Sequence, residues 1–176
     1  MKWALSIAGV LAFSFVLCGV VGFLLRNPRT TEMKVNLSVP IDTVWRLISD
    51  PEKQTEWRSD LVRVELRPVI GGYKTWTEHV KSGPPVTFKE TEVVRNTRYA
   101  LEIIPTMSFE GCSTIDLSMN HDGTTIRFVE VSIVSNPYWR VLSYIFYHPR
   151  QRMEVYVRDL TKAASPGELR LSADLR

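Results

Sequence analysis

The feature that most constrains this chain is a stretch of 22 residues without a charge, from Ala4 to Leu25. A helix of that length rises about 33 Å, which is enough to span the roughly 30 Å hydrocarbon core of a bilayer. Trp3 precedes the stretch and Arg26 follows it, and both residue types are typical of membrane interfaces. The sequence therefore predicts a single-pass membrane anchor, formed together with its flanks by residues 1–29.

A cleaved signal peptide and a buried core helix are the two alternatives to an anchor. The uncharged stretch is longer than the roughly 7–15 apolar residues of a signal peptide, and no Ala-x-Ala cleavage site follows it. Cys18 is preceded by Leu17, where a lipoprotein signal has a small residue. A core helix normally has one polar face, which this stretch lacks. The basic residues that follow the stretch outnumber those before it, which slightly favours a cytoplasmic location for the rest of the chain.

Composition excludes several classes of protein. The chain has 22 Lys and Arg against 19 Asp and Glu, and a net charge of +3 is too mild to indicate nucleic-acid binding. Two cysteines and three histidines, none at metal-ligand spacing, argue against a disulfide scaffold or a zinc site. No P-loop, dinucleotide fingerprint or nucleophile elbow is present. We therefore expect no nucleic-acid partner, no metal and no cofactor.

The length of 176 residues suits one domain besides the anchor. We place this domain at residues 30–165 and expect a disordered tail at 166–176, where charges alternate with few apolar residues. Alternating apolar and polar residues predict a first strand at 33–39, and two short helices follow over 42–57. The hydrophobic period then changes to two. Six successive strands are expected at 61–66, 73–80, 86–94, 99–103, 109–119 and 124–134, with a clear hairpin turn at 120–123.

A last long helix is expected from Pro137 to Ala164, with Asn136 as its N-cap. Pro149 should kink or interrupt this helix after Tyr147. Successive strands joined by short turns are antiparallel neighbours, and a sheet with one apolar face needs a cover. The C-terminal helix is the only expected element that is large enough, so we expect a cleft between this helix and the sheet.

Two stretches resemble the polyketide cyclase/dehydrase-like group of the START-like, or SRPBCC, superfamily: VNLSVPIDTVWRLISDPEKQTEWRSDLVRVEL at 35–66 and NPYWRVL at 136–142. The resemblance covers about residues 33–164. It implies an α+β helix-grip fold, in which a curved antiparallel sheet of about seven strands wraps on a long C-terminal helix, here behind one N-terminal transmembrane helix. It also implies a cavity between helix and sheet that binds a hydrophobic small molecule or a lipid, in a superfamily of binders, transfer proteins and a minority of enzymes.

The residues predicted to contact such a ligand are apolar and aromatic: Trp57, Trp76, Tyr99, Leu101, Ile103, Phe109, Leu117 and Trp139. An enzyme would need a positioned acid–base pair as well. His79 is the only histidine expected on a strand, and the adjacent Glu78 should point to the opposite face. We therefore expect an apolar inner face with at most His79 and no catalytic residue. This favours a membrane-anchored binder of a hydrophobic small molecule or lipid over the alternative, a cyclase/dehydratase-type enzyme acting on a polyketide-like substrate.

Overall fold

The computed structural model describes residues 2–106 and 108–165. Its elements follow the expected order of one long helix, a strand, two short helices, six strands and a C-terminal helical region. They are α1 (Lys2–Leu24), β1 (Arg29–Leu37), α2 (Ile41–Ile48), the short 3-10 helix η1 (Glu52–Glu56), β2 (Leu61–Ile70), β3 (Tyr73–Val80), β4 (Val86–Val94), β5 (Arg98–Thr106), β6 (Phe109–Asn120), β7 (Gly123–Val134), α3 (Pro137–Phe146) and α4 (Pro149–Ala164). The tail predicted at 166–176 lies outside the described residues.

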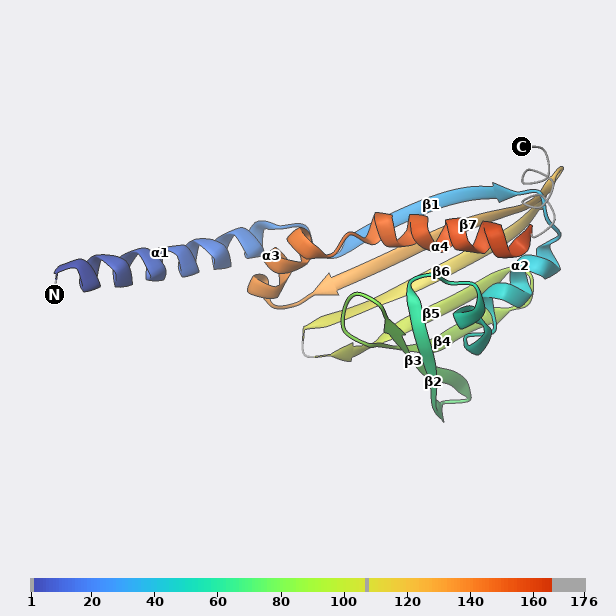
Figure 1. Ribbon diagram of the computed structural model, residues 1–176, viewed down its shortest axis with the longest axis horizontal. Coiled ribbons are helices and arrows are strands. Elements are labelled where there is room, and N and C mark those ends of the chain that lie inside the picture. The colour runs from blue at the N-terminus through green and yellow to red at the C-terminus, as the bar shows by residue number, and fades with distance from the viewer. Residues whose placement is uncertain (1, 107, 166–176) are drawn as a thin grey trace, which may run out of the picture.

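All seven strands form one antiparallel sheet in the order β1-β7-β6-β5-β4-β3-β2. The six strands that follow one another in the sequence are neighbours, as their short turns predict. Strand β1 pairs with β7, from Arg29 opposite Ser132 to Leu37 opposite Thr124, and so begins four residues earlier than expected. Figure 1 shows α4 lying along one face of the curved sheet. The predicted α+β helix-grip fold with about seven strands is confirmed.

The core lies between the inner face of the sheet and the helices α2 and α4. Val44 and Ile48, one helical turn apart on α2, are fully buried, and so is Leu160 on α4. Trp45 meets Tyr99 of β5 edge-on, with 6.0 Å between the ring centroids. These contacts place α2 against the sheet at one end of α4, which leaves the remaining length of the inner face to α4 alone.

The hairpin between β6 and β7 closes against the end of β1, and Gly123 makes this close approach possible. A Cβ atom at Gly123 would collide with the carbonyl oxygen of Leu37 and approach the backbone nitrogen of Val39. The hydroxyl of Thr124 donates a hydrogen bond to the Val39 carbonyl at 2.7 Å. The hairpin turn that the sequence predicts therefore also determines where β1 can end.

The C-terminal helical region consists of two helices, because the chain leaves helical geometry at Tyr147 and His148. Pro149 has no backbone N–H and its ring would clash with the preceding turn, so it begins a new helix instead of continuing α3. Asn136 caps α3 as expected, and its Oδ1 accepts hydrogen bonds from the backbone nitrogens of the second and third residues of α3 at 2.9 and 3.3 Å. No residue of α3, all of which the structure describes, is buried. The interruption predicted at Pro149 is therefore confirmed, and helix α3 leaves the inner face of the sheet.

Helix α1 forms where the uncharged stretch predicts it, and it packs against α3 at one end of the sheet (Figure 1). Phe15 stacks on Tyr138 with 4.4 Å between the ring centroids, and Arg140 Nη1 donates to the Gly22 carbonyl at 3.1 Å. A side chain at Gly22 would collide with the carbonyl of Pro137. Among the residues that the structure describes, no helix is both long enough and apolar enough to cross a membrane. The transmembrane assignment of this helix is therefore not supported.

Candidate functional site

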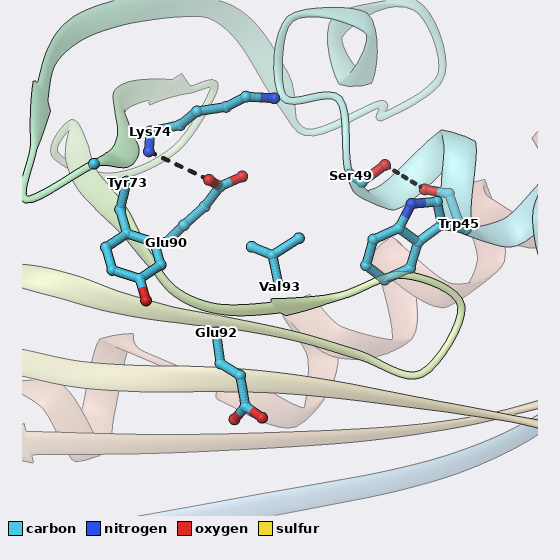
Figure 2. A pocket seen from close by; sticks show the side chains of 8 residues that line it. Trp45, Ser49, Tyr73, Lys74, Glu90, Glu92 and Val93 are labelled. Atoms are coloured by element: carbon cyan, nitrogen blue, oxygen red, sulfur yellow. Dashed lines mark hydrogen bonds between the residues drawn. The ribbon is translucent and has the colours of Figure 1, made fainter.

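The structure offers two hollows as candidate sites, and the wider one is an open groove beside α2. It measures about 560 Å³ and lies between Trp45 of α2 and the β3–β4 side of the sheet. Figure 2 shows that Glu90 points into this groove and accepts a hydrogen bond from the backbone nitrogen of Lys74 at 3.2 Å. The other oxygen of Glu90 accepts from the hydroxyl of Tyr99 at 3.1 Å. Burial and the Glu90 carboxylate together raise the pKa of Tyr99, which keeps this phenol neutral.

The second hollow is the cavity that the helix-grip fold implies, between the inner face of the sheet and α4. It measures about 130 Å³. Aromatic rings meet around it in pairs: Trp76 with Phe88 at 5.9 Å between centroids, Phe128 with Tyr156 at 5.5 Å, and Phe109 with Tyr147 at 5.8 Å. Val86, Tyr99, Leu101, Ile103, Ile115 and Met153 complete the apolar and aromatic lining. An apolar, largely preformed hollow with a few polar groups is the usual form of a small-molecule site, so this cavity is the better candidate.

The structure places most of the predicted ligand-contact residues on this cavity. Trp76, Tyr99, Leu101, Ile103 and Phe109 all line it. They come from β3, β5 and β6, whose alternation brings every second side chain to the inner face. Their role in binding a ligand stays a prediction.

Three predicted ligand-contact residues lie elsewhere. Leu117 is 5% exposed and belongs to the filled part of the core, together with the buried side chains of α2. Trp57 packs edge-on against Tyr156 at 5.3 Å between centroids, behind the cavity wall. Trp139 is 56% exposed, because the break at Pro149 takes α3 away from the sheet.

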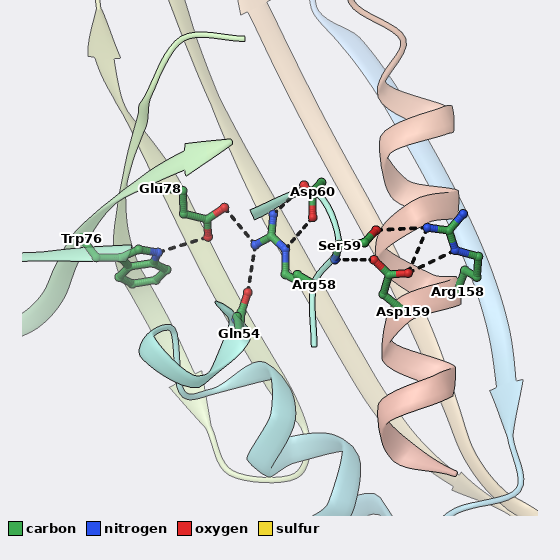
Figure 3. Close-up of polar contacts among 8 residues, drawn as sticks. All are labelled: Gln54, Arg58, Ser59, Asp60, Trp76, Glu78, Arg158 and Asp159. Carbon is green, nitrogen blue, oxygen red and sulfur yellow. Dashed lines mark hydrogen bonds and ion pairs between the residues drawn. The ribbon is translucent and has the colours of Figure 1, made fainter. Parts of the chain in front are cut away.

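A buried cluster of polar residues, which the sequence does not predict, forms one end of the cavity around Arg58 (Figure 3). Arg58 Nη1 donates to Glu78 Oε2 at 2.8 Å and to Gln54 Oε1 at 2.9 Å. Its Nε and Nη2 donate to the two carboxylate oxygens of Asp60 at 3.2 and 3.0 Å. The indole nitrogen of Trp76 donates to Glu78 Oε1 at 3.2 Å. We call Gln54, Arg58, Asp60 and Glu78 the Arg58 cluster.

Arg58 stays charged in this buried site because two carboxylates pair with it. Burial by itself would lower the pKa of Arg58, but the carboxylates of Glu78 and Asp60 outweigh it and hold the pKa above its ordinary value. The guanidinium also lies over the ring of Tyr156, 5.2 Å from its centroid. Burial raises the pKa of the Tyr156 phenol, so this hydroxyl is neutral and able to donate a hydrogen bond. The cluster therefore provides fixed charges and hydrogen-bonding groups inside an otherwise apolar cavity.

A second polar group lies where α3 meets α4. The hydroxyl of Tyr147 donates a hydrogen bond to Glu130 of β7, and Arg152 lies over the Tyr147 ring at 5.4 Å from its centroid. Burial, with the nearby Glu130 carboxylate, raises the pKa of Tyr147. These residues and Phe109 line the cavity at its other end.

The expectation of an apolar inner face is wrong, and the correction concerns β3. His79 lies on the outer face, where its Nε2 is 3.3 Å from Glu65 Oε2 of the neighbouring strand. Glu78 is the residue that enters the cavity, and it is 5% exposed. The sequence signal that could have predicted the position of Glu78 is its spacing from Trp76, because residues that are two apart on a strand lie on the same face of the sheet. Among the described residues, no group of three potential metal ligands gathers.

The loop that carries Arg58 is attached to α4 through Asp159, which is 4% exposed. Asp159 Oδ2 accepts a hydrogen bond from the backbone nitrogen of Ser59 at 2.7 Å, and its Oδ1 accepts from Arg158 Nη2 at 3.0 Å (Figure 3). Burial alone would raise the pKa of Asp159, but the hydrogen bonds from Ser59 and Arg158 outweigh it and hold the pKa below its ordinary value. This carboxylate fixes the position of the neighbouring Arg58 relative to the helix.

Replacing Glu78 with alanine should lower the free energy of unfolding by about 3–5 kcal/mol, because the buried Arg58 would lose one of its two carboxylate partners and the indole nitrogen of Trp76 would lose its acceptor. The matched control is Glu65→Ala on β2, where the side chain is 43% exposed and pairs with Arg67 at 3.3 Å. That surface pair should contribute less than about 1 kcal/mol. Chemical denaturation measures both variants, and equal losses would contradict this account of the cluster.

Replacing Asp159 with alanine should lower the free energy of unfolding by about 1–3 kcal/mol, because the backbone nitrogen of Ser59 loses its acceptor in a partly buried hydrogen bond. Since the folded pKa lies below the unfolded one, this contribution is present at neutral pH and lost as the pH falls below about 4. Thermal denaturation at pH 7 and pH 3 should therefore show a smaller difference between variant and wild type at pH 3. Glu154→Ala, an exposed pair with Arg150 on the same helix, should show little difference at either pH. An Asp159 effect that is the same at both pH values would contradict the prediction.

Comparison with known proteins agrees with the fold. The Zhui aromatase/cyclase from Streptomyces sp. R1128 superposes with a TM-score of 0.62 at 13% identity, over 79% of this chain and 94% of that one. The truncated norcoclaurine synthase from Thalictrum flavum gives 0.60 at 11% identity, over 77% and 92%. The di-domain ARO/CYC protein BexL from the BE-7585A biosynthetic pathway gives 0.66 at 9% identity, over 93% of this chain and 60% of that one. At these identities the likeness concerns the fold alone.

No curated protein matches the sequence. A family match, in contrast, covers residues 28–140, which is more than half of the chain and includes α2, η1 and all seven strands. This range contains the loop of Arg58 and the strands that line the cavity. The chain belongs to the family of polyketide cyclase/dehydrase and lipid transport proteins.

Proposed function

We propose that this protein binds a hydrophobic small molecule in the cavity between the sheet and α4. The observation that carries the proposal is the lining, which brings aromatic and aliphatic side chains from the sheet and α4 together around one hollow. Family membership supports the same function, because the family includes lipid transport proteins. A lipid with a long acyl chain needs a larger space than about 130 Å³, so we favour a small molecule as the ligand of this conformation.

A cyclase or dehydratase-type reaction on a polyketide-like substrate is the second candidate function. The observation that favours it is the Arg58 cluster, because charged groups and a neutral phenol, Tyr156, lie on the wall of the cavity. Such groups are what acid–base catalysis requires, and an apolar inner face would have argued against it. Turnover of a cyclisable poly-β-ketone by the purified protein would decide for this function over binding alone.

We also propose that α1 associates with a lipid membrane. Phe13, Val16 and Phe23 are between 61% and 79% exposed, and no charged residue lies between Lys2 and Arg26. A helix that is apolar on all sides is normally surrounded by apolar groups. Arg26 directly follows the uncharged stretch, and its positive charge would attract anionic headgroups.

Filling the cavity should abolish ligand binding. In Val86→Trp the larger ring occupies the space that Val86 borders, so binding of 4-fluorotoluene, followed by its ¹⁹F resonance, should weaken at least about tenfold. Val94→Trp on the same strand is the control, because Val94 is 45% exposed and does not line the cavity. Equal affinity in the two variants, or no binding by the wild type, would rule out this cavity as the site.

Membrane association should depend on the apolar surface of α1. The full-length chain should float with anionic vesicles and resist carbonate extraction, and a chain that begins at Thr30 should stay in the soluble fraction. Val16→Arg should weaken flotation, because a charge among lipid tails costs about 2.5–3.5 kcal/mol. Val94→Arg on the sheet adds the same charge and should float like the wild type. Release of the full-length chain by carbonate would contradict the proposal.

A further inference from the structure

The Arg58 cluster limits which chemical groups of a ligand can bind at the end of the cavity where the cluster lies. Four of the five N–H groups of Arg58 already donate to side-chain oxygens of the cluster. The face of the guanidinium lies over the Tyr156 ring. Arg58 is therefore poorly placed to bind a carboxylate or phosphate of a ligand, although it is a buried cation.

The other hydrogen-bond donors on the cavity wall are few. The hydroxyls of Tyr99 and Tyr147 already donate to Glu90 and Glu130. The hydroxyl of Ser113 also lies on the wall, and like that of Tyr156 it is able to donate or accept. Apart from Arg152, whose guanidinium is exposed to solvent, the donors of this cavity are thus mostly committed to protein acceptors.

Negatively charged groups on the cavity wall, in contrast, outnumber positively charged ones, and not every acceptor there is paired with a protein donor. The charged lining consists of three carboxylates, on Asp60, Glu78 and Glu130, and two guanidiniums, on Arg58 and Arg152. Arg152 is exposed to solvent and lies on the Tyr147 ring, so water screens its charge. Glu130 uses only Oε1 for Tyr147, which leaves Oε2 without a protein donor within the described residues.

We infer that the cavity takes a ligand of about the size of one aromatic ring that carries a hydrogen-bond donor, and that it rejects a carboxylate of the same size. The inference rests on the proposed function, because it specifies the ligand of the same cavity. A phenolic hydroxyl finds carboxylate oxygens that accept its hydrogen bond, whereas a ligand carboxylate meets like charges on the cavity wall. The volume of this cavity, about 130 Å³, is close to the volume, about 150 Å³, of an apolar cavity that holds benzene, which limits the ligand to about one ring.

The test compares three ring-sized probes that differ in one substituent: 4-fluorophenol, 4-fluorotoluene and 4-fluorobenzoate. Their ¹⁹F resonances are titrated at pH 7 with the full-length protein in lipid nanodiscs, and partition into empty nanodiscs is subtracted. At this pH the phenol is neutral and the benzoate is ionised. We expect 4-fluorophenol to bind at least about fivefold more tightly than 4-fluorotoluene and at least about tenfold more tightly than 4-fluorobenzoate.

The experiment distinguishes a failure of the proposed function from a failure of the inference about the hydrogen-bond donor of the ligand. If none of the probes binds, the proposed function is wrong. If 4-fluorotoluene binds but 4-fluorobenzoate binds as tightly as 4-fluorophenol, the cavity binds apolar ligands and the inference about the donor is wrong. A preference for 4-fluorophenol over both other probes supports the inference.

A charge-neutral variant identifies the groups that select the ligand. Glu130→Gln keeps the size of the side chain and an acceptor for Tyr147, and it leaves the Arg58 cluster intact. It should reduce the preference for phenol over benzoate at least about threefold. Glu110→Gln is the control, because Glu110 is exposed on β6 and does not line the cavity. An unchanged preference in Glu130→Gln would overturn the assignment of selectivity to the cavity carboxylates.

Discussion

A single helix of 16 residues, α4, covers the inner face of a seven-stranded sheet, and its length constrains everything else in the domain. At 1.5 Å per residue it extends about 24 Å, which is too little to fill the concave side of a curved sheet. One end is filled because α2 adds its own apolar face to the core. The rest is lined but not filled, so a cavity between α4 and the sheet is the direct consequence of this cover.

The Arg58 cluster occupies the border between the filled and the open part of that space. Two charges taken out of water are costly unless each finds its partners, and here the guanidinium binds two carboxylates and an amide. The same contacts connect η1, the loop of Ser59 and β3, and Asp159 extends them to α4. The wall of the candidate cavity and the contacts that hold these elements together therefore share residues, which is why a charge-neutral change at Glu130 tests the proposed function more cleanly than one at Glu78.

The break at Pro149 gives the C-terminal region two separate roles. Helix α4 stays on the sheet, whereas α3 turns away and packs on α1 through Tyr138 and Arg140. Tyr147, one of the two residues between the helices, remains on the cavity wall and bonds to Glu130. The apolar helix α1 and the end of the cavity thus meet at one short junction, so a ligand bound there would lie close to whatever surface α1 contacts.

The sequence by itself determined the order of elements, the antiparallel neighbours and the break at Pro149, because these depend on periodicity, turns and proline geometry that are local. It also placed Tyr99, Leu101, Ile103 and Phe109 on the inner face. Only the tertiary structure decided what Arg58 does, since its partner Glu78 is 20 residues away and both faces of β3 are mixed in composition. The tertiary structure likewise decided that α3 leaves the sheet. A buried charge can be recognised only when its partners are known, because burial and pairing are properties of packing and not of any one segment.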